Sequence, residues 1–282
     1  MPANPDRMAT RGSNHVNSEP PTQSSFFIQR LKQSILHVQE YARLSFRSVA
    51  NLFSPPHYVV DLVQQMDRIG VGSLPIVMLT GGFIGGILVL QTASQFARFG
   101  QTALTGDVTA LGLVRELGPT ITGLLVAGRN ASAMASELGS MVVSEQVDAM
   151  RAMGTDPSRK LVTPRVVATT LMLPLLVAVG DLIGLIGGYI VSRFTLSVGA
   201  VQFWSRAIDA LVLSDIAQGL VKPVVFGFII ATVGCYQGLN VKGGTEGVGR
   251  ATTTAVVVSS VVILVADLFL SKFMLYAAAH FF

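Results

Sequence analysis

The sequence predicts an all-α integral membrane protein, with an N-terminal amphipathic interfacial helix followed by five transmembrane helices. Half of its 282 residues are hydrophobic and only 13% are charged, whereas soluble globular chains carry about 25% charged residues. The apolar residues form long stretches that are almost free of charge, and the basic residues gather in the N-terminal region and between those stretches. The formal net charge of +4 therefore follows membrane topology and does not indicate a nucleic-acid partner.

Two segments are expected before the spans. Residues 1–25 are rich in Pro, Asn and Ser and lack the apolar stretch of a secretory signal, so we expect a disordered tail. Residues 26–53 carry an apolar stripe at helical spacing with basic side chains beside it, which is typical of a helix lying in the membrane interface. The alternative is an amphipathic helix that packs on a soluble partner protein, which would show the same pattern. The stripe consists of Ile28, Leu31, Ile35, Val38, Ala42, Phe46 and Val49, and the basic residues are Arg30, Lys32, Arg43 and Arg47.

Residues 54–282 are predicted to form the membrane domain. A transmembrane helix needs about 20 consecutive apolar residues, and five stretches meet this requirement. Small residues spaced by four recur in the first three spans and let helices approach closely, either within one chain or across a homodimer. The spans are predicted at 68–98, 108–143, 165–193, 216–241 and from 251 towards the C-terminus.

The distribution of cations predicts the orientation. Lys and Arg are concentrated in the N-terminal helix and in the segments 148–165 and 242–250, which an odd number of spans places on one side. The positive-inside rule makes that side the cytoplasm, so the N-terminus is expected inside and the C-terminus outside. The lone Cys235 excludes a disulfide framework.

A compact basic segment, Asp148 to Arg165, separates the second and third spans. Its first half is rich in helix formers, Gly154 is placed to end a helix, and the Asp-Pro pair after it favours a turn. We therefore predict a short helix at about 145–157, which would transmit a rigid-body shift better than an irregular loop, although a basic loop between spans needs no special function. The acid-to-Gly spacing, with Pro164 ten positions later, resembles the coupling-helix motif of ABC-transporter permeases. The predicted coupling residues are Asp148, Ala149, Met150, Arg151, Met153, Gly154, Asp156 and Pro157.

Three separate runs extend this resemblance: LVRELGPTITGLLVAGRNASAMASELGSM, EQVDAMRAMGTDPSRKLVTPR and GGTEGVGRATTTAVVVSS. They are similar to those of the MlaE (YrbE) family, the permease subunits of Mla- and Mce-type phospholipid transporters, and the similarity reaches from Leu52 to the C-terminus. The resemblance implies a permease that acts as a homodimer in the bacterial inner membrane. It also implies a cytoplasmic ABC ATPase pair, an MCE-domain ring on the outer side, and often a small STAS-domain protein as partners.

The chain itself is not expected to be an enzyme. Its nearest approach to a phosphate loop, GTEGVGRAT at Gly244 to Thr252, has Arg250 in place of the Lys and Ala251 in place of the Ser or Thr that would reach Mg²⁺. The four histidines are scattered, and no metal-ligand or nucleophile–base arrangement is recognisable. ATP and Mg²⁺ are therefore expected in a partner, and no cofactor is expected in this chain.

Ionisable residues within the predicted spans need partners or a cavity, because each costs about 2.5–3.5 kcal/mol on insertion scales. Counting along the spans separates them by depth. The outer half is expected to hold Glu116, Lys222 and Asp267, and the middle Asp181. The cytoplasmic part is expected to hold Arg129 and Glu137, which are expected to pair structurally within one subunit or across two. Asp181 and Asp267 receive no role from the sequence.

An apolar cavity with charges in its outer half would suit a phospholipid. We hypothesise that Lys222, with Arg115 and Glu116, marks the head-group end of such a site, and that Leu90 and Gln91 line the same cavity. The family resemblance associates the Glu of the RELGP run and a Lys of the fourth span with the lipid cavity. A Glu116–Lys222 ion pair that only holds the bundle together is the alternative.

Two other functional classes remain open at this stage. The buried carboxylates would suit an ion-coupled secondary transporter, although the sequence shows no inverted repeat and five spans do not divide evenly. A structural membrane scaffold without a transport cycle is the second alternative. Co-purification of an ATPase would discriminate in favour of the permease.

Overall fold

The computed structural model describes residues 23–53, 55, 58–196 and 198–281, and these are mostly helical with no strand among them. Five helical segments are long and apolar enough to cross a membrane, which confirms the predicted fold class. They are Val59–Arg98, Thr105–Val143, Ser158–Leu196, Leu213–Leu239 and Gly244–Ala277.

The chain divides into two compact units, residues 1–40 and 41–282. Helix α1, Gln23–Ala50, begins slightly before the predicted start at residue 26 and is followed by the short turn η1, Asn51–Phe53. The remainder of the predicted tail lies outside the described residues. Several side chains of the predicted apolar stripe are exposed: Ile35, Val38, Phe46 and Val49.

Spans one to three are built from consecutive helical pieces. Span one combines α2 (Val59–Met66), η2 (Asp67–Val71) and α3 (Gly72–Arg98). Span two follows η3 (Thr102–Leu104) and combines α4 (Thr105–Gly112), η4 (Leu113–Leu117), α5 (Gly118–Val126), η5 (Ala127–Ala131) and α6 (Ser132–Val143). Span three combines η6 (Ser158–Val162) and α8 (Thr163–Leu196). The segments η2, η4, η5 and η6 are π-helical turns, which often occur at functional sites.

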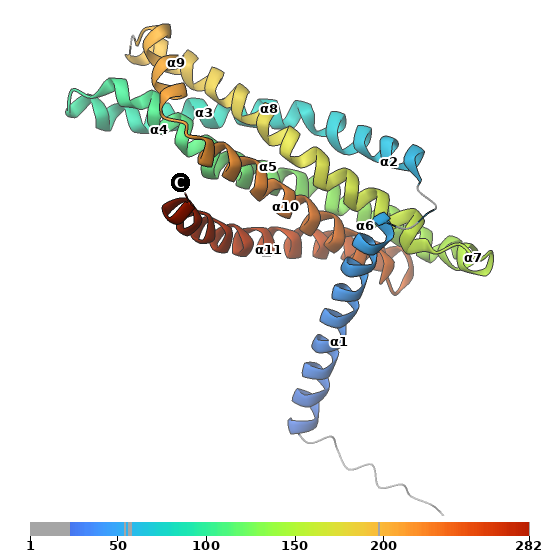
Figure 1. The fold of residues 1–282 in the computed structure, drawn as a ribbon. Helices are drawn as coiled ribbons and strands as arrows, with labels where there is room; N and C mark the ends of the chain where they lie inside the picture. Colours follow the sequence, from blue (N-terminus) through green and yellow to red (C-terminus); the bar gives the residue numbers. More distant parts are fainter. Residues whose placement is uncertain (1–22, 54, 56–57, 197, 282) are drawn as a thin grey trace, which may run out of the picture. The chain divides into compact units, whose positions relative to one another are not determined.

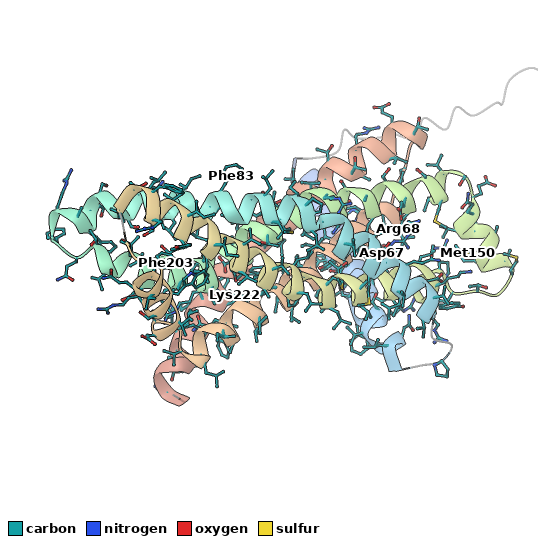
Figure 2. The ribbon with its side chains drawn as sticks, turned by 90° about the horizontal axis from the view of Figure 1, so that it is seen from above. Asp67, Arg68, Phe83, Met150, Phe203 and Lys222 are labelled. Atoms are coloured by element: carbon teal, nitrogen blue, oxygen red, sulfur yellow. The ribbon has the colours of Figure 1, made fainter. Side chains whose placement is uncertain are left out.

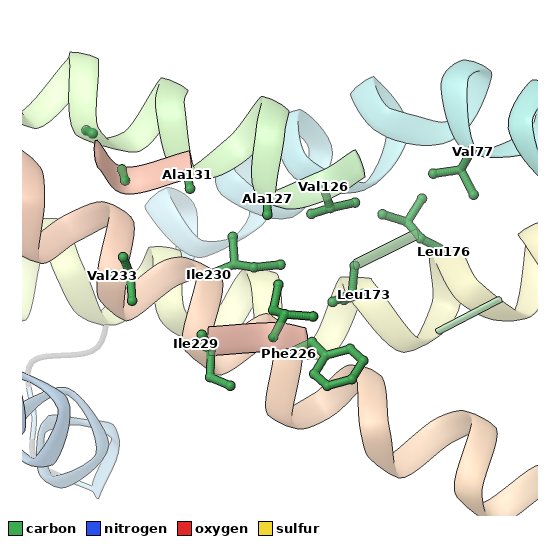
Figure 3. Packing of buried hydrophobic residues seen from close by; sticks show 13 residues of the cluster. Val77, Val126, Ala127, Ala131, Leu173, Leu176, Phe226, Ile229, Ile230 and Val233 are labelled. Atoms are coloured by element: carbon green, nitrogen blue, oxygen red, sulfur yellow. The ribbon is translucent and has the colours of Figure 1, made fainter. Parts of the chain in front are cut away.

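Spans four and five are the single helices α10 (Leu213–Leu239) and α11 (Gly244–Phe281). Buried side chains from the first four spans meet in the interior, and α11 adds Ala255 and Ile263. Figure 3 shows this cluster, in which Phe226 and Ile230 of α10 lie among residues of the other spans. The labelled members include Val77, Val126, Ala127, Leu173, Leu176, Ile229 and Val233.

Glycines let α3 and α8 pack closely along their length. A Cβ added to Gly81 would lie 2.5 Å from the carbonyl oxygen of Gly180, and one added to Gly85 would overlap that of Gly184. Small residues allow this approach of backbones in lipid, where packing and not hydrophobicity drives helix association. The sequence left open whether these glycines pack helices within one chain or across a dimer. In the structure, Gly81 and Gly85 pack against α8 of the same chain.

Two short helices mark opposite ends of the bundle (Figure 1). Helix α7, Gln146–Ala152, connects spans two and three, and α9, Ala200–Asp209, connects spans three and four. The sequence did not predict α9, which packs through Phe203 on Val89 and Val198. Figure 2 likewise places Met150 of α7 at the far end from Phe203, with Lys222 in the half near Phe203.

Candidate functional site

The fully buried side chain of Lys222 is the centre of a charge cluster in the α9 half of the bundle. Its Nζ donates hydrogen bonds to the carbonyl oxygen of Arg115 at 2.8 Å and to Glu116 Oε2 at 2.7 Å, and it lies 3.1 Å from Asp267 Oδ1. Three oxygens therefore surround an ammonium group that has three donors. The predicted Glu116–Lys222 pair is present in the structure.

A local sequence feature explains how Arg115 can offer its carbonyl group. Pro119 stands four residues after Arg115 and has no N–H to donate to that oxygen. The π-helical turn η4 also changes the helical register at this point, and the Arg115 carbonyl oxygen accepts a hydrogen bond from Lys222 Nζ. The RELGP run thus places a carboxylate and a backbone acceptor side by side in the membrane.

Two carboxylates complete the cluster, and sequence reasoning gave neither a role in it. Asp215 is fully buried. It accepts hydrogen bonds from Arg115 Nε at 2.7 Å and from the backbone N–H of Val212 at 3.1 Å. Asp267 accepts a hydrogen bond from Thr120 Oγ1 at 2.9 Å. A spacing signal existed for Asp215, since it lies two helical turns before Lys222 on α10 and therefore on the same face.

Exposure divides the cluster into a buried and an open part. The side chains of Lys222 and Asp215 are 0% exposed and Asp267 is 16% exposed, whereas Arg115 and Glu116 are 37% and 48% exposed. Ser271 of α11 adds a hydrogen bond to Glu116 Oε2 at 3.2 Å. In this conformation Arg115 and Glu116 are the members available to a ligand, and Lys222 holds the open part in place.

The structure places the two predicted lining residues of span one elsewhere. Leu90 and Gln91 are both exposed, and Leu90 lies in an apolar groove between α3 and α8 together with Phe83 and Ile190. None of the described hydrogen bonds or ion pairs joins either residue to the Lys222 cluster.

The segment predicted to couple to an ATPase forms a short rigid element. Helix α7 is shorter than the predicted 145–157, because Gly154 adopts a φ of 77° and a turn follows. Val147 is buried, and Met150 packs on the same hydrophobic cluster as the ends of the spans on the α7 side. These contacts fix α7 to the bundle, so that a force on the helix would reach the spans.

The other predicted coupling residues either stabilise the turn or face outwards. Arg151 Nη1 donates to Asp148 Oδ1 at 2.7 Å, and Asp156 Oδ1 accepts from the backbone N–H of Ser158 at 2.9 Å. Met153 is 75% exposed, which leaves a large apolar side chain uncovered at the end of the bundle. The outward residues also include Ala149 and Gly154, whereas Pro157 is buried.

The remaining intramembrane charges have separate environments. Glu137 pairs with Arg68 at 3.2 Å and with the nearly buried Arg165 at 2.9 Å. Arg129 instead donates a hydrogen bond to Ser73 Oγ at 2.7 Å. Asp181 is buried in α8, and its Oδ1 has no hydrogen-bond partner within the described residues. Among all the residues that the structure describes, no group of His, Cys, Asp and Glu side chains is arranged to hold a metal ion.

Comparison with known proteins agrees with this architecture. The family model described as "Permease MlaE" matches residues 62–273, which cover all five spans except the start of span one and the end of span five. The chain belongs to the MlaE permease family. It is therefore a multi-pass membrane permease, and the names of its relatives describe permease proteins of transport systems.

Three relatives illustrate the breadth of the MlaE family. A probable ABC transporter permease protein of Rickettsia typhi is 42% identical over 82% of this chain and 90% of its own length. The intermembrane phospholipid transport system permease protein MlaE of Haemophilus influenzae is 35% identical over 88% of this chain and 97% of its own. The chloroplastic protein TRIGALACTOSYLDIACYLGLYCEROL 1 of Arabidopsis thaliana is 41% identical over 76% of this chain and 61% of its own.

Proposed function

We propose that this MlaE-family chain is the permease subunit of an ABC-type phospholipid transporter in a bacterial inner membrane. Its single strongest support is the combination, in one bundle, of a rigid exposed helix at one end and an open charge cluster at the other. The relative from Haemophilus influenzae carries a phospholipid transport name. The chain would move lipid between the inner membrane and an MCE-domain protein on the outer side.

The proposed assembly contains two copies of this chain, a cytoplasmic ABC ATPase that supplies ATP and Mg²⁺ binding, and an MCE-domain ring, with a STAS-domain protein as a further partner. The α7 end would face the cytoplasm, because the basic residues near it include Arg151, Arg159, Lys160 and Arg165. The N-terminus would then be cytoplasmic and the C-terminus periplasmic.

Helix α7 would dock into the ATPase and carry its closure to the spans. Val147 and Met150 anchor the helix inside the bundle, while the exposed Met153 is free to enter a groove of the partner. Burying a methionine side chain contributes about 2 kcal/mol, which is enough to influence docking. The contact is therefore expected to depend on this one apolar side chain.

Met153→Asp tests the docking. We expect the amount of ATPase that co-purifies with the detergent-solubilised chain to fall at least about tenfold, because the variant loses apolar burial and introduces a charge. Val201→Asp is the matched control, since Val201 is 84% exposed on α9 at the opposite end. Equal ATPase recovery with both variants would contradict docking through α7.

The lipid head group would be held at the open part of the outer cluster. Arg115 offers a cation for a phosphate and Glu116 a carboxylate for an amine or hydroxyl, while Lys222 and Asp215 hold both side chains from behind. Apolar side chains of the surrounding spans would contact the acyl chains. This arrangement keeps Lys222, Arg115 and Glu116 of the predicted site and assigns them different tasks, whereas Leu90 and Gln91 are not part of it.

Glu116→Gln tests the head-group contact. Glutamine keeps an oxygen that accepts from Lys222 but loses the charge, so we expect normal assembly and a lipid transfer rate about tenfold lower. The control is Asp107→Asn, which removes another carboxylate near the outer end. Asp107 pairs with Arg206 at 3.8 Å, and this variant is expected to retain lipid transfer. Unchanged transfer in Glu116→Gln would remove this residue from the site.

A further inference from the structure

A second polar site lies in the α7 half of the bundle, away from the Lys222 cluster. A cleft of about 640 Å³ separates the beginning of span one from the second half of span two, and this volume falls within the range of known ligand pockets. Figure 2 shows Asp67 and Arg68 of its wall in the same half as Met150. The other polar lining residues are Arg129, Asn130, Glu137 and Gln65.

Arg129 has no acidic partner in this cleft. It is exposed, its described hydrogen bond goes to Ser73 Oγ, and no carboxylate of the described chain lies within 4.0 Å of it. The neighbouring Glu137 is already shared between Arg68 and Arg165. The cleft is lined by the arginines Arg68 and Arg129 and by the carboxylates Asp67 and Glu137. Arg165 also pairs with Glu137 without lining the cleft, so the Arg129 guanidinium keeps a charge that no ion pair neutralises.

Two further features shape the cleft around the Arg129 guanidinium. Gly72 lies beneath it, and a Cβ at that position would stand 2.6 Å from Nη2, so glycine provides the space. Asn130 is 5% exposed, and its side-chain Nδ2 has no acceptor among the described residues. A buried donor without a partner costs free energy until an acceptor reaches it. An anion in the cleft would supply one.

The depth of the cleft indicates where such an anion comes from. Arg68 is the last charged residue before the uncharged run 69–97 of span one, so it marks the level at which the hydrocarbon region begins. Lipid phosphates lie at this level. Val71, which is 57% exposed and lines the cleft, adds apolar surface beside the cations.

We propose that this cleft binds the phosphodiester head group of a phospholipid from the leaflet on the α7 side, with the Arg129 guanidinium as its main ligand. Arginine matches phosphate oxygens with paired N–H donors. Asn130 contributes a second donor, and Asp67 stands where the amine of a zwitterionic head group would be accommodated. The site is distinct from the one in the proposed function and does not depend on ATP-driven transport.

A lipid cross-linking experiment on the full chain tests the site. A photoreactive amino acid replaces Ala133, which lines the cleft, and the protein is placed in vesicles of phosphatidylethanolamine and phosphatidylglycerol that contain diacylglycerol as a phosphate-free lipid. We expect preferential cross-linking of the phospholipids, and a loss of about tenfold with Arg129→Gln. Ser73→Ala, which removes the intramolecular hydrogen bond but keeps the cation, is expected to retain the cross-link.

Controls separate the possible results. The same photoreactive residue at Val257, an exposed apolar position of α11, is expected to react with both lipid classes without preference. Arg129→Lys keeps the charge and is expected to retain part of the signal, which guards against a variant that merely folds poorly. Three results would overturn the proposal: no preference for phospholipid at Ala133, displacement of the lipid by millimolar inorganic phosphate, or cross-links to a second copy of the chain. None of them bears on ATPase docking.

Discussion

Lys222→Met is expected to lower the stability of the detergent-solubilised protein by about 3 kcal/mol, because it leaves the carboxylates of Glu116 and Asp267 without their cation. Removing one charge of a buried ion pair lowers the free energy of unfolding much more than neutralising both charges does. The exposed half of Glu116 limits the effect, since water can reach that carboxylate. Thermal unfolding followed by the loss of a monodisperse elution peak measures the change.

The matched control is Lys272→Met, which removes an exposed lysine of α11 and is expected to leave stability unchanged. Combining Lys222→Met with Glu116→Gln and Asp267→Asn neutralises the cluster and is expected to recover most of the lost stability. A Lys222→Met protein as stable as the wild type, but unable to transfer lipid, would instead show that the ammonium group acts directly on the substrate.

Gly85→Ala is expected to destabilise the bundle by about 1–3 kcal/mol, because the added methyl group overlaps the carbonyl oxygen of Gly184 and forces α3 away from α8. Backbone atoms cannot rotate out of the way as a flexible side chain can. The shift would also disturb Gly81, which is packed against the same helix. Thermal unfolding in detergent measures this effect as well.

Gly128→Ala serves as the comparison, since nothing lies within 4 Å of a Cβ at that position. Alanine is a better helix former than glycine, so this variant is expected to be as stable as the wild type or slightly more stable. Equal stability of the two alanine variants would show that α3 and α8 are not packed as closely as the structure has them.

The spans could be predicted from the sequence because lipid imposes a strong requirement on composition and length. An uncharged run such as 69–97 has few alternatives to a membrane helix. Helix α9 could not be predicted in the same way. It is short, and its Phe203 and Trp204 acquire a role only through packing on Tyr189 of the preceding helix α8 and on Val89, which is distant in sequence.

The charge cluster was predictable only in part. Glu116 and Lys222 stand out as charges within apolar runs, and their common depth indicates a pair. Asp215 lies at the start of span four, where a carboxylate is ordinary for a helix N-terminus. Its contact with Arg115 depends on how two helices are rotated against each other, which the sequence of a single chain does not reveal.

The charges at the α7 end of the bundle illustrate the same limit. Glu137 and Arg129 were expected to pair structurally, and the structure gives Glu137 two other arginines from spans one and three. The spacing along span two places both residues toward one end but says nothing of which neighbouring helix each faces. The cleft at Arg129 follows from that rotation and from the glycine at position 72.

The most direct test of the proposed function is lipid transfer in proteoliposomes by this chain reconstituted with the proposed ABC ATPase and the proposed MCE-domain protein. We expect lipid transfer that requires ATP hydrolysis, disappears with Met153→Asp, and persists after proton and sodium gradients have been collapsed. Transfer driven by an ion gradient without the ATPase would contradict the proposed function in favour of a secondary transporter, and a stable complex that transfers no lipid would point to a scaffold.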